Sequence, residues 1–278
     1  MASLINTSSF ELRRNIIKPF LEELAVIVRT TKDYRIWLFI AWNDLKSRYR
    51  RTLLGPFWLV LANSITIIGM AVIWSVIFHL QLKEYFPQLT AAMICWTLIA
   101  YTITEAGGTF VNQSAIIQNL PVPIYLHALR LISRNVITFL HNFLIFIMVS
   151  LFFSANLTIY TLLFFPLFIL LVVNLFALSF IFGVVGARYR DFPQILTALM
   201  SVVIYVTPVM WDVKMLGDHY LLAYLNPLTH LLFIIKMPLL GECPPLVSII
   251  FVLVVTIINF IAMVVMSRRY SHRIAYWV

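Results

Sequence analysis

The amino-acid sequence predicts an all-α integral membrane protein with six transmembrane helices. Hydrophobic residues make up 62% of the 278 positions, charged residues only 11%, and the mean hydropathy is +0.95. About a quarter of the residues in a soluble domain are charged, so this chain has too few charges to cover a globular surface in water. The long apolar runs are continuous rather than alternating, which favours helices over the strands of a membrane barrel. The composition therefore excludes a soluble enzyme, a secreted disulfide scaffold and a disordered protein.

Residues 1–55 are predicted to form an amphipathic arm in the cytoplasmic interface. Ser8 and Glu11 fit a capping box, and Pro19 suits the first position of a helix. Apolar residues then recur at helical spacing, and a second helix is predicted to start at Asp33. Its polar and basic content favours a place on the membrane surface rather than across it. The arm ends in the basic residues Lys46, Arg48, Arg50 and Arg51.

The remaining residues, 56–278, are predicted to form one six-helix transmembrane domain. A helix needs about 20 mostly apolar residues to cross a bilayer. Five of the six segments contain no charged residue, and the second contains only Glu105. The predicted spans are 57–80, 89–111, 135–153, 159–185, 192–211 and 246–266.

Residues 212–245 are predicted to form a re-entrant outer hairpin of two short helices, because Pro227 and Pro238 interrupt their apolar stretch. With six spans and a cytoplasmic start, 17 Lys and Arg lie inside and 3 lie outside. A seventh span would place the three C-terminal arginines outside, against the positive-inside tendency. Both termini are therefore predicted to be cytoplasmic. The first apolar run, 36–42, is too short and too late for a signal peptide.

The sequence carries no recognisable catalytic or metal motif. No glycine is followed by lysine, so a phosphate-cradling nucleotide loop is absent, and the two cysteines form neither a disulfide framework nor a metal site. The net charge of +9 is interpreted as basic cytoplasmic loops rather than a nucleic-acid surface. Glu105, the one ionisable residue inside a predicted span, is either a functional carboxylate or one that faces the bundle near the headgroups.

Two groups of side chains are candidates for contact with substrate. Arg48, Arg50 and Arg51 either anchor the arm on anionic lipid or bind a phosphorylated lipid headgroup, and both roles are compatible. On a helix Arg48 and Arg51 share a face, so they are predicted to bind as a pair while Arg50 anchors. Some aromatic residues either line a conduit for sugar rings or belong to the lipid-facing belt. These aromatic candidates are Trp74, Tyr205 and Trp211.

Several segments, in order along most of the chain, resemble the membrane subunits of polysaccharide-exporting ABC transporters. The run 43–58, NDLKSRYRRTLLGPFW, resembles the approach to their first span. Their loops and outer hairpin are matched by 119–123 (NLPVP), 188–191 (RYRD), 207–210 (TPVM) and 225–229 (LNPLT). The chain departs from the pattern at Lys236 and Pro238, which leaves open whether the glycan is O-antigen, capsule or teichoic acid.

The resemblance implies a homodimeric permease in a bacterial inner membrane, joined to two separate ATP-binding subunits. Its substrate would be a polysaccharide on undecaprenyl diphosphate, with O-antigen as the foremost choice. ATP and Mg²⁺ would bind to the partner subunits, so no cofactor is expected in this chain. The alternatives are an integral membrane enzyme acting on a lipid-linked sugar, and a scaffold or small-molecule permease. The resemblance assigns coupling to the ATPase to inner-loop residues Gln113, Asn119, Tyr125, Arg188, Arg190 and Asp191.

Overall fold

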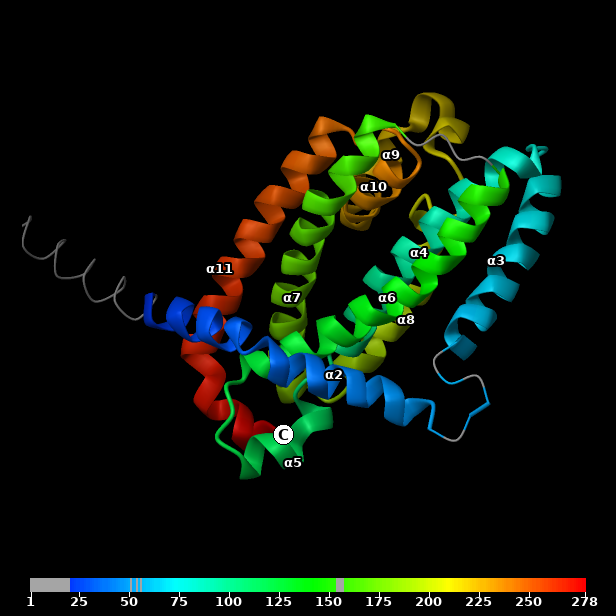
Figure 1. The fold of residues 1–278 in the computed structure, drawn as a ribbon. Coiled ribbons are helices and arrows are strands. Elements are labelled where there is room, and N and C mark those ends of the chain that lie inside the picture. The colour runs from blue at the N-terminus through cyan, green and yellow to red at the C-terminus, as the bar shows by residue number, and fades with distance from the viewer. Residues whose placement is uncertain (1–20, 51, 54, 56, 154–157) are drawn as a thin grey trace, which may run out of the picture.

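The computed structural model describes residues 21–50, 52–53, 55, 57–153 and 158–278, and within these ranges the protein is helical with no strand. The predicted all-α class is therefore confirmed. Five helices in the described part are long and apolar enough to cross a membrane; a short link joins the first two, and a longer one that contains α5 joins the second to the third (Figure 1). They are α3 (Phe57–Ile77), α4 (Leu82–Ala106), α6 (Tyr125–Phe153), the continuous η2 and α7 (Ile159–Leu163 and Phe164–Arg188) and α11 (Leu246–Trp277).

Helix α4 is the centre of the bundle and packs against α3, α6, α7, α8 and α10. Two thirds of its most apolar stretch (67%) is buried, against 17% for α3. The fully buried Ala91, Ala92 and Cys95 are small, and small residues let neighbouring helices approach closely within a membrane. The closest approach lies at the end of α4, where a Cβ on Gly186 of α7 would fall 1.9 Å from the Gly107 carbonyl oxygen.

The arm crosses one end of the bundle rather than running along it. A first helix covers 21–32, and α2 (Tyr34–Arg48) follows with Asp33 at its N-cap position, which confirms the predicted start. In Figure 1, α2 lies across the lower end of the bundle, near α5 (Ser114–Asn119) and the C-terminus. Its residues Ala41 and Leu45 are buried and packed on the bundle side, whereas Phe39 is 67% exposed. Apolar side chains thus occur on both faces of α2, so the arm is less cleanly amphipathic here than predicted.

We call this the arm end of the bundle, defined by α2, α5 and the last turn of α11. The opposite hairpin end carries the segment after α8 (Phe192–Val206), with η3 (Val213–His219) and α9 (Leu221–Leu225). From there α10 (Pro227–Leu239) packs against α4, α7 and α11.

Helix boundaries differ from the predicted spans for identifiable reasons. Helix α4 ends at Ala106, before two glycines, instead of reaching residue 111. Helix α8 ends at Val206 instead of residue 211, because Thr207 precedes a proline and is extended with ψ 139°. Helix α6 begins at Tyr125, ten residues before the predicted span, and α11 continues to Trp277. Both extensions contain polar residues, which can continue a helix beyond the apolar stretch that crosses the hydrocarbon core. The predicted capping box at Ser8 and Glu11 and the first-turn Pro19 lie outside the described residues.

Candidate functional site

Ion pairs at the arm end connect three segments that are far apart in the sequence. The Arg130 guanidinium of α6 donates through Nε and Nη2 to the two carboxylate oxygens of Asp44 in α2, at 2.5 and 2.6 Å. It also donates to the side chain of Gln113 in η1 (Val111–Gln113). Two parallel bonds of this kind fix both distance and orientation, so they hold α2 in one register on α6.

A second group centres on Glu105 in the last turn of α4. Its Oε2 accepts from Arg134 of α6 at 2.6 Å, and its Oε1 accepts from Arg48 of α2 at 3.4 Å. The Arg134 side chain is 17% exposed and that of Arg48 is 51% exposed. Glu105 is therefore a bundle-facing carboxylate, as one of the two predicted interpretations has it, and it is shared unequally between two arginines.

A small cavity of about 120 Å³ lies between these two groups. His127 of α6 faces it, is only 2% exposed, and neither ring nitrogen has a hydrogen-bond partner in the described part of the chain. Three arginines and one carboxylate, Glu105, line the cavity, and Asp44 pairs with Arg130 beside it, which leaves one excess positive charge among these five groups. Such a site favours an anion. Tyr49, which follows Arg48 in the sequence, adds no negative charge, because partial burial raises the pKa of its phenol.

The predicted headgroup residues are partly included in this arrangement. Arg48 contributes to the ion-pair network, and Arg50 is exposed in the turn that follows α2. Arg51 lies outside the described residues, so the proposed pairing of Arg48 with Arg51 stays a prediction. The contact that the structure does give Arg48 is Glu105, from a helix 57 residues away in sequence.

Two of the predicted coupling residues, Arg188 and Arg190, contact the C-terminal turn at the arm end. Arg190, in the link between α7 and α8, donates to the Trp277 carbonyl oxygen at 2.7 Å, and the Arg188 guanidinium lies 5.6 Å from the Trp277 ring centroid. Tyr125 donates to Glu23 of the first helix at 2.8 Å. Of the remaining three, Gln113 contacts Arg130. Asn119 lies at the exposed end of α5, and Asp191 immediately precedes α8.

The three predicted aromatic candidates do not form one cluster. Tyr205 near the end of α8 is 66% exposed, and Trp211 donates from its indole nitrogen to the Tyr205 carbonyl oxygen at 3.0 Å. Trp74 belongs to α3, where it stacks on Phe78 with 5.1 Å between ring centroids. That Tyr205 and Trp211 line a conduit together therefore stays a prediction. No contact in the described part of the chain links Trp74 to either of them.

Sequence reasoning missed the pairing partners Asp44, Arg130 and Arg134, together with His127. The signal for two of them was present, since Arg130 and Arg134 are four residues apart and share a helix face. They were assigned to a loop because the predicted span began only at residue 135. Asp44 and His127 had no sequence signal beyond being polar in an apolar chain.

A bundle that contains five helices long and apolar enough to cross a membrane is typical of a multi-pass membrane protein. No family model matches the chain. It is similar to the O-antigen export system permease protein RfbA of Myxococcus xanthus, at 18% identity over 211 residues that cover 74% of this chain and 81% of that protein. This similarity confirms the predicted resemblance to membrane subunits of polysaccharide exporters. It favours a transport subunit over the predicted alternative of a membrane enzyme.

Proposed function

We propose that the chain is the membrane-spanning subunit of an ABC transporter that exports a polysaccharide, with O-antigen as the foremost substrate class. The observation that carries the proposal is the similarity to an O-antigen export permease over three quarters of the chain. The order of the family-like segments along the sequence supports it independently. The proposed system comprises two copies of this chain and two separate ATP-binding subunits, because the chain has no nucleotide-binding loop of its own.

The proposed topology has six crossings, with both termini on the cytoplasmic side of the inner membrane. The link between α7 and α8 contacts Trp277, so α7 and α11 both end at the arm end. Helix α11 has 32 residues and spans about 48 Å, which means that Leu246 lies at the hairpin end. In the proposed topology the chain crosses between residues 190 and 246, and α8, with 15 residues, is the longest apolar helix in that stretch.

Helix α8 has 15 residues and extends only about 22 Å, less than the roughly 30 Å of a hydrocarbon core. The non-helical residues after Val206 would complete the crossing. Their backbone is partly satisfied by protein: Lys236 donates to the Pro208 carbonyl oxygen and Tyr85 donates to that of Met210. Satisfaction of this kind is what non-helical backbone at membrane depth requires, and it supports a hairpin (212–245) that dips in without crossing.

Arg48 and Arg51 are proposed to bind the diphosphate of the lipid carrier, undecaprenyl diphosphate. The Arg48 guanidinium is half exposed and uses Nη2 in a long 3.4 Å contact, so a phosphate oxygen can compete with Glu105 for it. Arg134, at 2.6 Å from Glu105 and mostly buried, would keep the carboxylate neutralised when Arg48 leaves.

Export by cells that carry variants of the chain tests this function. The double substitution Arg48→Gln and Arg51→Gln should abolish surface polymer while the protein remains inserted and bound to its ATPase partner. Arg50→Gln is the matched control and should retain most export. Normal export by the double variant at normal expression would reject the headgroup site, and normal export in cells that lack the chain altogether would reject the function.

A further inference from the structure

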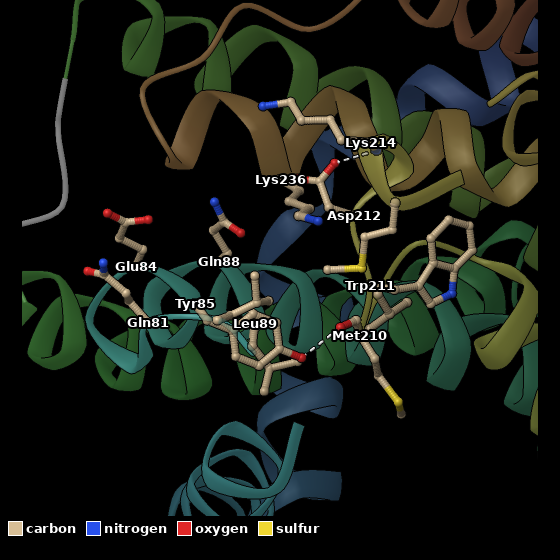
Figure 2. Close-up of a pocket in the computed structure, with 13 residues that line it drawn as sticks. Gln81, Glu84, Tyr85, Gln88, Leu89, Met210, Trp211, Asp212, Lys214 and Lys236 are labelled. Carbon is tan, nitrogen blue, oxygen red and sulfur yellow. Dashed lines mark hydrogen bonds between the residues drawn. The ribbon is translucent and has the colours of Figure 1, made fainter. Parts of the chain in front are cut away.

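Two adjoining cavities open at the hairpin end, far from the ion pairs of the arm end. The first, of about 300 Å³, lies between the first turns of α4 and the segment that follows α8 (Figure 2). The second, of about 380 Å³, lies between that segment, α9 and α10. Four residues line both cavities, so together they form one cleft, which we call the hairpin cleft. The shared residues are Gln88, Asp212, Lys214 and Lys236.

Side-chain bonds to the backbone fix one wall of the hairpin cleft in place. Tyr85 of α4 donates to the Met210 carbonyl oxygen at 2.6 Å, and the Lys236 ammonium donates to that of Pro208 at 3.2 Å. Asp212 accepts from the Lys214 backbone N–H at 2.9 Å and caps η3. The wall is therefore held from two different helices, which makes the cleft preformed rather than a gap between loops.

The opposite wall carries polar groups that have no protein partner. Gln81, Glu84 and Gln88 recur along the first turns of α4, and Figure 2 shows them on the side of the helix that lines the cavity. Their side chains make no hydrogen bond within the part of the chain that the structure describes. Gln88 is partly buried and lines both cavities, so its amide is available to a ligand in the cleft.

The charges around the hairpin cleft are mixed and nearly balanced, which disfavours a phosphate or any other strong anion as ligand. Carboxylates accept, ammonium groups donate, and amides do both, so the lining matches a ligand whose groups also do both. Sugar hydroxyls have that property. The charged lining residues are Glu84, Asp212 and Glu242 with Lys214 and Lys236.

Aromatic rings complete the recognition chemistry. Trp211 lies at the rim of the first cavity, and its indole nitrogen already has a partner in the Tyr205 carbonyl oxygen. Tyr220 and Tyr224 line the second cavity in an edge-to-face pair with 6.3 Å between ring centroids. Rings of this kind pack against the apolar C–H face of a sugar while neighbouring polar groups bind its hydroxyls.

We propose that the hairpin cleft binds a short, uncharged segment of the exported glycan within a single protomer. The inference rests on the proposed function, because the glycan is the hydroxyl-rich ligand that such a transporter would bring to this end. The cleft adjoins the end of α8, where the predicted conduit residues Tyr205 and Trp211 lie. It thus provides a place where the emerging chain is held after it leaves the spans.

Photo-cross-linking in exporting cells tests the proposal with the native polymer as probe. The photoreactive residue p-benzoylphenylalanine replaces Tyr220, which lines the cleft, or Leu246, which is even more exposed at the same end but does not line it. Glycan-bearing adducts should form at position 220 and not at 246. Equal adducts at both positions, adducts with lipid alone, or no glycan adduct at 220 while export proceeds would overturn the proposal.

Gln88→Leu removes the amide at nearly constant volume and should lower the glycan adduct at position 220 about fivefold, the loss expected for one hydrogen bond. Lys83→Gln, an exposed change near the start of the same helix that does not line the cleft, should leave the adduct unchanged. If Gln88→Leu does not accumulate, the exposed Glu84→Leu tests the same wall. Unchanged adduct in the cleft variants rejects this site alone. The proposed function fails separately, if cells without the chain still export the polymer.

Discussion

The double-bonded pair of Arg130 and Asp44 predicts a measurable coupling between the arm and the bundle. The side chains are only 15% and 20% exposed, and two charge-assisted bonds join them at 2.5 and 2.6 Å. Exposed pairs contribute at most about 1 kcal/mol, whereas breaking a fully buried pair costs about 3–5 kcal/mol. A mostly buried pair should fall between them, so we expect about 2 kcal/mol, which corresponds to roughly a 30-fold change in local opening.

Hydrogen-exchange mass spectrometry of the protein in lipid nanodiscs measures that opening in α2. Arg130→Met keeps the packing of the aliphatic stem, and Asp44→Asn keeps the shape of the carboxylate. Each variant should accelerate exchange of the α2 amides about 30-fold, and the double variant should do little more, because one interaction has been removed in all three. Arg273→Met, at an exposed position of α11, is the control and should change nothing in α2. Multiplying effects in the double variant would refute the coupling.

Three further predictions follow from particular contacts. Gly186→Ala should prevent accumulation of folded protein, measured by size-exclusion chromatography, because its Cβ would lie 1.9 Å from the Gly107 carbonyl oxygen. Glu105→Gln should destabilise the protein by about 2 kcal/mol, whereas Arg48→Gln, at a half-exposed position, should cost at most about 1 kcal/mol; thermal unfolding in detergent compares them. A cysteine at Ser271 should be labelled only from the cytoplasmic face, and labelling from outside would contradict the six-crossing topology.

The membrane class could be predicted from the sequence because lipid imposes strict demands on composition. Every spanning segment must be long, apolar and internally hydrogen-bonded, so α3 and α11 are recognisable from their residues alone. The ends of helices were harder to predict, because an apolar run and the helix that contains it can stop at different residues. Helix α8 stops at Val206 because of the following Thr-Pro step, although apolar residues continue to Trp211.

The candidate sites were only half predictable. Glu105 and Arg48 were noticed as charges next to apolar spans, but nothing local indicates that they contact one another across 57 residues. Asp44 and Arg130 are separated by 86 residues, and their pairing depends on how α2 crosses the bundle. The hairpin cleft was missed because its walls come from the start of α4 and from a segment whose proline breaks were interpreted only as limits to a span.

The ion pairs at the arm end also bear on the charge asymmetry from which the topology was inferred. Arg48, Arg130 and Arg134 were counted among the inner basic residues, yet each contacts a carboxylate of α2 or α4. The positive-inside tendency counts Lys and Arg and gives Asp and Glu little weight, so the ion pairs by themselves change the predicted orientation little. Even with these three arginines left out, the other arginines and lysines assigned to that side far outnumber the three lysines assigned to the other. The predicted orientation therefore survives the removal of the paired residues, and those arginines are better understood as the contacts that hold the arm to the bundle.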